Sequence, residues 1–208
     1  MSFQASILTP VQVNVLRLLG PLTKREGFYL AGGTAVALRF GHRRSVDFDW
    51  FAPTLEHPDA LMGRIGAQGL GLEVDQVEAG TLIGRINGVK ISFLQFPYPM
   101  LDPLEFWPHF GVDIASLRDL QAMKLLAIAQ RGSRKDFVDV HELLQQGASL
   151  RDMLHAFDAK FSTDRISALR GLTYFDDAEA EPMPEMLNKR EWKTVRSDIT
   201  RAVRDFMA

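Results

Sequence analysis

The sequence predicts an α+β fold, in which a mixed β-sheet flanked by helices is followed by a helical C-terminal half. Between residues 28 and 94, short apolar or alternating runs rich in β-branched and aromatic residues stand between turn residues, as strands do. From residue 113 onward, apolar residues recur every three or four positions, as on helices. A length of 208 residues and a hydrophobic content of 46% are enough for a substantial core.

Composition excludes several classes of protein. A formal net charge of −2 gives no overall attraction to nucleic acid or acidic membranes, so such a contact would need a local basic patch. The absence of cysteine excludes disulfides and thiolate metal sites. No apolar run approaches the roughly 18 residues of a membrane span, and the first residues lack the pattern of a secretion signal. We therefore expect a cytoplasmic protein without a membrane partner.

The first elements follow from caps and apolar spacing. Thr9 and Pro10 begin a helix, which Gly20-Pro21 either ends or interrupts. Residues 28–31 form a predicted buried strand. Farther along, a short helix is expected over residues 60–67. No regular structure is expected over residues 97–108, which contain four prolines.

Two glycines follow the first predicted strand. Gly32 and Gly33 let the backbone turn and approach a ligand closely, and Thr34 can cap a helix over residues 35–40. Amide groups and the positive end of a helix dipole then point at one place, which favours a phosphate.

A strictly alternating segment follows the basic turn at residues 42–44. In the run from Val46 to Phe51, Asp47 and Asp49 project from one face of a strand and apolar residues from the other. Two neighbouring carboxylates repel each other unless a cation lies between them. Mg²⁺ is a hard ion that takes carboxylate and phosphate oxygens. Taken singly, the glycine pair is equally compatible with a tight loop, and the acidic strand with a solvated edge.

The order of these elements resembles the nucleotidyltransferase superfamily of the DNA polymerase beta type. It consists of a strand, a Gly-Gly-Thr turn, a helix, a basic turn and an Asp-x-Asp strand. The residues of this motif resemble still more closely those of the AbiEii/AbiGii-type nucleotidyltransferase toxins of bacterial abortive-infection toxin–antitoxin pairs. The resemblance implies that Asp47 and Asp49 are catalytic and hold Mg²⁺ or Mn²⁺. It also implies a cradle for the triphosphate of an NTP substrate, formed by Gly32, Gly33 and Thr34, with positive charge from Arg44 and Lys90.

Three strands are predicted in the middle of the chain, over residues 72–77, 81–86 and 89–94. The Asn87-Gly88 pair is a strong hairpin signal, so the last two should be antiparallel neighbours. In the resembled superfamily a strand in this place carries a third metal-binding carboxylate, whereas residues 89–96 contain no Asp or Glu. If this strand lies beside the Asp47 strand, Ser92 or Lys90 takes that place. We then expect at most one metal ion.

The helical half begins with an apolar helix over residues 117–130, preceded by a capping pattern at Ser116 and Asp119. Lys124 lies within the stripe that should face the core. A lysine there needs a carboxylate or a phosphate as a partner, or its stem must carry the ammonium group to solvent.

A second helix starts at Ser133 and places Asp136 and Asp139 one turn apart. Asp136 alone is equally explained as a residue that offsets the helix dipole. Together, residues 123–140 resemble a second signature of the AbiEii-type family, a helix lysine followed by a basic turn and a Lys/Arg-Asp-x-x-Asp helix. The resemblance implies that Lys124 is catalytic and meets nucleotide phosphates, and that Asp136 and Asp139 orient it or the incoming nucleotide.

The remaining chain is predicted to be helical over residues 149–161, 164–171 and 189–207, with an acidic loop over residues 176–184. Basic residues on the last helix form either a solvated face or an RNA patch; they are Lys193, Arg196, Arg201 and Arg204. We assign residues 1–112 to a nucleotidyltransferase-like α/β core and residues 113–208 to a helical half, packed together as one compact unit with the nucleotide in the cleft between them.

The predicted activity is metal-dependent transfer of a nucleotidyl group from an NTP. The acceptor is a protein side chain or the end of an RNA, for which the resembled toxins suggest tRNA, and an antitoxin protein is an expected partner. A rival interpretation is a nucleotide- or partner-binding module without catalysis, which the missing third carboxylate supports. Another is a toxin-derived protein whose working surface is the one that an antitoxin covers.

Overall fold

The computed structural model describes residues 3–208, which form two compact units. The first unit comprises the chain up to Arg39, together with Ser45–Pro99 and Pro103–Ala115. The second comprises Phe40–Arg44, Met100–Asp102 and Ser116–Ala208. The main division therefore follows Ala115, near the division that the sequence suggests after residue 112.

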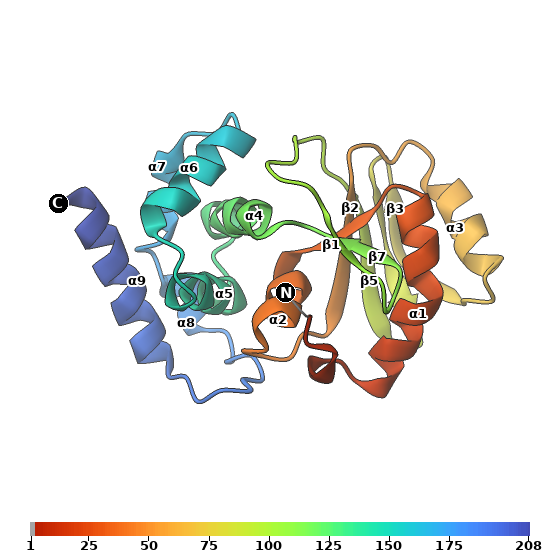
Figure 1. The fold of residues 1–208 in the computed structure, drawn as a ribbon, viewed down its shortest axis with the longest axis horizontal. Coiled ribbons are helices and arrows are strands. Elements are labelled where there is room, and N and C mark those ends of the chain that lie inside the picture. Colours follow the sequence, from red (N-terminus) through yellow and green to blue (C-terminus); the bar gives the residue numbers. More distant parts are fainter. Residues whose placement is uncertain (1–2) are drawn as a thin grey trace. The chain divides into compact units, whose positions relative to one another are not determined.

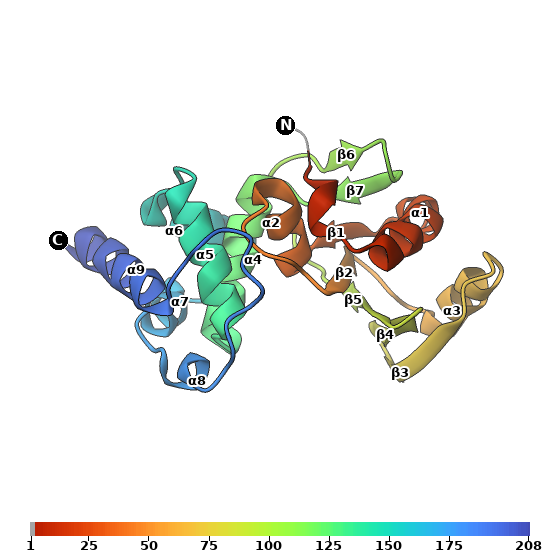
Figure 2. The ribbon, with the colours of Figure 1, turned by 90° about the horizontal axis from the view of Figure 1, so that it is seen from below.

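Within the described residues, the first unit is built on a seven-stranded sheet (Figure 1). The strand order is β3-β4-β5-β2-β1-β7-β6 (Figure 2). Strand β2 pairs with β1 in the antiparallel sense and with β5 in the parallel sense, so the sheet is mixed, as predicted. The strands are β1 (Tyr29–Ala31), β2 (Asp47–Ala52), β3 (Leu72–Glu78), β4 (Thr81–Ile86), β5 (Val89–Gln95), β6 (Glu105–Trp107) and β7 (Val112–Ile114).

The predicted hairpin between β4 and β5 is confirmed. The two strands are antiparallel, and Ile86 is paired with Val89 across the turn. Asn87 and Gly88 have φ values of 51° and 77°. Positive φ at both central residues matches the turn whose twist suits a hairpin. The register of β5 is thereby fixed by local sequence.

The two faces of the sheet differ in burial. Phe48 and Trp50 of β2 are fully buried, and so are Leu82 of β4 and Ile91 of β5. Asp47 and Asp49 alternate with the buried residues of β2 and are half-buried. Helices α1 (Pro10–Arg25) and α3 (Pro58–Gly66) pack on the sheet (Figure 2). One face is therefore core, and the other carries the predicted site.

Helix α1 continues through Gly20 and Pro21, a point that the sequence left open. A Cβ atom at Gly20 would lie 2.2 Å from the carbonyl oxygen of Phe110 and 2.6 Å from Val112. Glycine is needed here because the helix lies against the loop between β6 and β7. The turn signal of Gly20-Pro21 therefore reports close packing and not the end of the helix.

The prediction of no regular structure over residues 97–108 is wrong for β6. This strand pairs antiparallel with β7, with Glu105 opposite Ile114 and Trp107 opposite Val112. The prolines lie outside its three residues, and an edge strand needs only one hydrogen-bonded neighbour. A short helix, α8 (Asp176–Glu179), likewise forms within the segment predicted to be an acidic loop.

The second unit is helical, as predicted, and α4 packs on α5, α6 and α7 while α5 packs on α9. Besides α8, its helices are α4 (Leu117–Gln130), α5 (Arg134–Gln145), α6 (Leu150–Lys160), α7 (Arg165–Gly171) and α9 (Trp192–Met207). Within residues 3–208, no helix combines the length and apolar character needed to cross a bilayer.

Candidate functional site

The Gly-Gly turn and the acidic strand meet at Gly32 and Asp49. Strand β1 ends at Ala31, which is paired with Asp49, and α2 (Gly32–Phe40) begins at the next residue. Gly32 has a φ of +66°, and a Cβ atom there would lie 2.9 Å from Oδ2 of Asp49. Both the left-handed backbone and the carboxylate therefore favour glycine at this position. The Asp49 carboxylate consequently lies against the start of α2.

The two carboxylates have polar neighbours on β5. In the parallel register, Asp47 is opposite Lys90 and Asp49 is opposite Ser92. The two strands are therefore neighbours, which is the condition under which Lys90 or Ser92 was expected beside the acidic pair. Lys90 is exposed, whereas Ser92 is buried.

Thr34 does not cap α2, contrary to the sequence prediction. The helix begins two residues earlier, at Gly32, so Thr34 lies within it. Its buried hydroxyl lies 2.7 Å from Oγ of Ser45 and donates a hydrogen bond to the carbonyl of Asp47. Thr34 therefore holds the entry to β2, and a contact of its side chain with a triphosphate stays a prediction.

The donor set at Asp47 and Asp49 fits a hard divalent cation. The two carboxylates are half-buried on one face, beside a helix start whose amides suit phosphate oxygens. Within residues 3–208, no group of three or more Asp, Glu or His side chains could hold a metal ion. An ion at this place would therefore have two protein carboxylates and take its other oxygen ligands from nucleotide or water.

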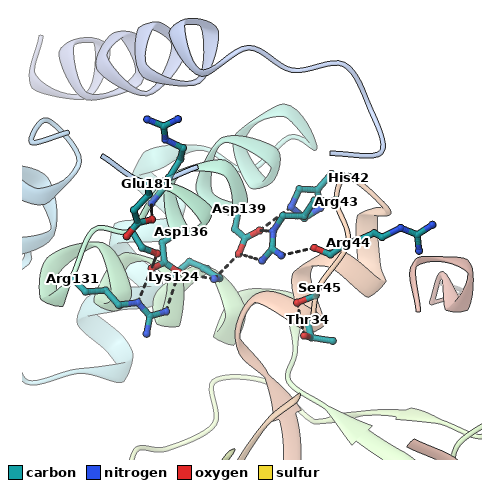
Figure 3. A network of polar contacts seen from close by, with 12 residues as sticks. Thr34, His42, Arg43, Arg44, Ser45, Lys124, Arg131, Asp136, Asp139 and Glu181 are labelled. Atoms are coloured by element: carbon teal, nitrogen blue, oxygen red, sulfur yellow. Dashed lines mark hydrogen bonds and ion pairs between the residues drawn. The ribbon is translucent and has the colours of Figure 1, made fainter. Parts of the chain in front are cut away.

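A second cluster of charges is buried within the helical unit (Figure 3). Nζ of Lys124, on α4, lies 2.9 Å from Oδ1 of Asp136 and 2.6 Å from Oδ2 of Asp139, both on α5. Lys124 is 3% exposed, and the two aspartates are fully buried. Of the alternatives that the sequence left open for this lysine, a carboxylate partner is the one observed.

Asp139 also holds the basic turn that precedes β2. Arg43 donates to both carboxylate oxygens, from Nε at 2.7 Å and from Nη2 at 2.8 Å. Nε2 of His42 lies 2.8 Å from Oδ1. Because an ionised carboxylate only accepts, this ring nitrogen is the one that carries the proton. A bidentate arginine pair fixes geometry as well as charge, so Asp139 anchors the turn.

Asp136 is held by a separate set of donors. Arg131 donates from Nε at 2.8 Å and from Nη2 at 3.1 Å, and Oγ of Ser133 donates at 2.7 Å. Asp136 also lies in the first turn of α5, where a negative charge offsets the helix dipole. The structural role that the sequence offered for Asp136 is thus present together with its contact to Lys124.

The pKa values in this cluster follow from burial opposed by charge. Burial alone would raise the pKa of Asp139, but Arg43 and Lys124 outweigh it and hold that pKa well below its usual value. The pKa of Asp136 is lowered in the same way, against burial, by Lys124 and Arg131. Burial alone would lower the pKa of Lys124, yet Asp139 and Asp136 raise it. All three groups are therefore charged at neutral pH.

The turn at residues 42–44 also pairs with a distant segment of the second unit. The amide of Arg44 donates to the carbonyl of Glu185 at 2.8 Å, and the amide of Leu187 donates to the carbonyl of His42 at 3.0 Å. Nε of Arg44 lies 2.8 Å from Oε1 of Glu185. This predicted nucleotide contact thus has a carboxylate partner, and its binding role stays a prediction.

The sequence did not identify His42, Arg43 and Arg131 as parts of a charged cluster. For His42 and Arg43 the signal available was the run of basic residues directly before the acidic strand. The pattern alone does not connect these residues with Asp139, which lies 97 and 96 positions later. Asp136 and Asp139, by contrast, were identified from their spacing on one helix together with the resemblance to the second AbiEii-type signature.

Comparison with known proteins identifies the family. Residues 86–208 match the family described as nucleotidyl transferase AbiEii toxin, Type IV TA system. The chain belongs to the AbiEii nucleotidyl transferase toxin family. The matched part of this AbiEii-family chain contains Lys124, Asp136 and Asp139, whereas Gly32, Asp47 and Asp49 lie before it. Protein aq_aa25 of Aquifex aeolicus is 33% identical over 190 residues, which cover 86% of the AbiEii-family chain and 88% of the relative.

Solved structures share the fold of this AbiEii-family chain. JHP933 from Helicobacter pylori matches with a TM-score of 0.58 at 16% identity, over 98% of this chain and 92% of its own. The nucleotidyltransferase toxin MenT4 from Mycobacterium tuberculosis matches with a TM-score of 0.56 at 14% identity, over 93% and 82% of the two chains. These matches confirm the predicted α+β, nucleotidyltransferase-like fold.

Proposed function

We propose that this AbiEii-family protein transfers a nucleotidyl group from an NTP to an acceptor, with Mg²⁺ or Mn²⁺ held by Asp47 and Asp49. The observation that carries the proposal is the position of the Asp49 carboxylate against Gly32. The Gly-Gly turn and the Asp-x-Asp strand, which are separate in the sequence, thus form one site that contains two carboxylates and the start of a helix. A metal-bound triphosphate needs such a combination of hard anionic ligands and amide donors.

Each part of the site has a defined task in this proposal. The backbone amides at Gly32 and Gly33 bind phosphate oxygens, and the absence of side chains permits their close approach. A cation held by the two carboxylates would neutralise charge that develops on the leaving pyrophosphate. Asp47 and Asp49 hold their carboxylates on one face, and Thr34 fixes the strand entry beside them. Lys90 adds positive charge next to Asp47.

In the proposed site, Lys124 holds the carboxylates of Asp136 and Asp139 in place. Its ammonium group lies between the two carboxylates, and the side chain is 4% exposed. Asp139 in turn holds Arg43, which stands four positions before Asp47 in the chain. A direct contact of Lys124 with a phosphate, and nucleotide contacts of Asp136, Asp139 and Arg44, remain part of the family-derived prediction.

The proposed acceptor is the end of an RNA, with a protein side chain as the alternative. The AbiEii family description names a toxin of a Type IV toxin–antitoxin system. By that relationship we propose an antitoxin partner whose presence limits the activity.

The test is transfer of label from each of the four NTPs, carrying ³²P at the α-phosphate, with Mg²⁺ or Mn²⁺. Total RNA and the protein itself serve as acceptors. The proposal predicts labelled RNA or labelled protein with the parent chain, and no label with Asp47→Asn. Transfer that survives this substitution would contradict the role of Asp47.

A second candidate is a module that binds a nucleotide without transferring it. The observation in its favour is Ser92, a hydroxyl, at the position opposite Asp49. A hydroxyl is a poor base, so Ser92 would not activate an acceptor. Metal-dependent NTP binding without transfer to any acceptor would support this candidate.

A further inference from the structure

A row of charged residues crosses the open face of the sheet beside the acidic pair. Asp47 of β2 is opposite Lys90 of β5, Lys90 is opposite Arg85 of β4, and Arg85 is opposite Glu73 of β3. Residues paired across strands project from the same face of a sheet. Two cations therefore follow Asp47 in consecutive strands, and Lys90 is the nearer one.

The next row differs in character. Asp49 is opposite Ser92, and Ser92 is opposite Ile83 of β4. Beyond Asp47 and Asp49, these two rows therefore offer no further carboxylate on β5 or β4. The position beside the acidic pair holds an ammonium group in one row and a hydroxyl in the other.

The register puts Lys90 on the strand next to Asp47, on the face that carries the acidic pair. Neighbouring strands lie about 4.8 Å apart, and paired metal ions in two-metal sites lie roughly 3.5–4 Å apart. Because a lysine stem is flexible, the ammonium group of Lys90 can reach the place that a second ion would take. It repels a second divalent ion and also supplies part of the positive charge that such an ion would provide.

We propose that this site binds a single divalent ion with its nucleotide, and that the ammonium group of Lys90 takes the place of the second ion. The inference rests on the proposed function, because it concerns the same acidic pair. The ammonium group of Lys90 binds the polyphosphate from the side of the site away from β1. One divalent ion and this ammonium group then share the neutralisation of the carboxylates and the triphosphate, in place of two divalent ions.

The experiment counts bound Mn²⁺ by electron paramagnetic resonance, with an NTP analogue whose α,β-bridge is a methylene group. The parent chain should bind one ion per protein–analogue complex. Lys90→Glu should bind two, because it removes the ammonium group and adds the missing carboxylate at the same position. Lys90 is exposed, so this substitution should leave the melting temperature nearly unchanged.

Arg85→Glu is the matched control. It makes the same change of charge in the same row, one strand farther from Asp47, at a side chain that is 48% exposed. It should still bind one ion. Two ions in the parent chain, one ion in folded Lys90→Glu, or two ions in Arg85→Glu would each overturn the inference and leave the proposed function standing. A parent chain that binds neither Mn²⁺ nor the analogue would overturn the proposed function itself.

Discussion

Gly32 matters both for the backbone conformation and for the chemistry of the proposed site. Its φ of +66° belongs to the left-handed region, where a side chain costs about 1–2 kcal/mol. The Asp49 carboxylate lies against the same position. A side chain at residue 32 would therefore do two things: strain the backbone and displace a proposed metal ligand.

Gly32→Ala should lower the free energy of unfolding by about 1–2 kcal/mol and weaken metal-dependent nucleotide binding at least tenfold, or about 1.4 kcal/mol. Gly27→Ala is the matched control, because Gly27 has a φ of +77° and nothing within 4 Å of the added Cβ. It should show the same loss of stability with unchanged binding. Urea unfolding and titration calorimetry separate the two effects, and equal binding in both variants would contradict the role of the turn.

Lys124 is a buried lysine, whereas most lysines in proteins are exposed to solvent. It lies between two buried carboxylates, each of which has an arginine as a second partner. Breaking a buried pair by removing one partner leaves an uncompensated charge, which is strongly destabilising. The remaining arginines reduce that penalty without removing it.

Lys124→Met should therefore lower the free energy of unfolding by about 3 kcal/mol, at the low end of the range for a broken buried pair. Lys193→Met, at an exposed position on α9, should change it by less than about 0.5 kcal/mol. Chemical denaturation of both variants measures the difference. A parent-like stability for Lys124→Met would show that the buried carboxylates do not need this lysine.

At the scale of elements, the packing of α1 depends on a glycine in its interior. The helix approaches the β6–β7 loop so closely that a Cβ at Gly20 would overlap the backbone of Phe110. Backbone cannot rotate away as a flexible side chain can, so the clash must be relieved by moving the helix.

Gly20→Ala should lower the free energy of unfolding by about 2–3 kcal/mol, the upper part of the range for overpacking. Gly63→Ala provides the opposite case, because Gly63 lies inside α3 with nothing within 4 Å of an added Cβ. It should raise stability by about 0.5–1 kcal/mol through its better helix propensity. Thermal melts should shift in opposite directions, and a stabilised Gly20→Ala would refute this account of the packing.

The elements that the sequence predicted correctly are those with local signals. Strand β2 follows from strict alternation, and the β4–β5 hairpin follows from Asn87-Gly88, whose turn conformation needs no distant partner. Strands β6 and β7 have three residues each, and they exist because each finds a partner in the sheet. Their short sequences contain too few residues to show a period of two.

The residues of the candidate site likewise divide into those that local sequence signals predict and those whose contacts depend on distant parts of the chain. Gly32, Asp47 and Asp49 follow from motifs. Thr34 was predicted as a helix cap, but α2 begins at Gly32, and the Thr34 hydroxyl bonds to β2 instead. The anchoring of Arg43 by Asp139 joins positions that are 96 residues apart. Sequence pattern supplies the charges of such a pair without indicating which charge meets which.

At the scale of the whole molecule, stability should depend on pH through His141. Nε2 of this buried histidine lies 2.8 Å from Oδ2 of Asp198 on α9. Its other ring nitrogen faces Arg190, which itself pairs with Glu142. Burial, followed by the charge of Arg190, lowers the pKa of His141, although Asp198 and Glu142 oppose them.

A lowered histidine pKa means that the unfolded chain binds the proton more readily than the folded one. Stability therefore falls as pH decreases below about 6.5, the usual histidine value. His141→Gln should reduce the loss of stability between pH 7 and pH 5. The pKa of Asp198 is also lowered, but its contribution is lost only at lower pH. Urea midpoints across this range provide the measurement, and identical slopes for parent and variant would exclude His141 as the cause.

In the proposed site, Asp47 and Asp49 hold a metal-bound nucleotide against the Gly32 turn. The most direct measurement is calorimetric titration of the parent chain, Asp47→Asn and Asp49→Asn with non-hydrolysable analogues of the four NTPs, with Mg²⁺ and with EDTA. The account predicts binding of at least one analogue that requires Mg²⁺, and a loss of about 100-fold or more, roughly 2.8 kcal/mol, in each folded variant. Binding that is equal with EDTA, or equal in the parent chain and both variants, would contradict it.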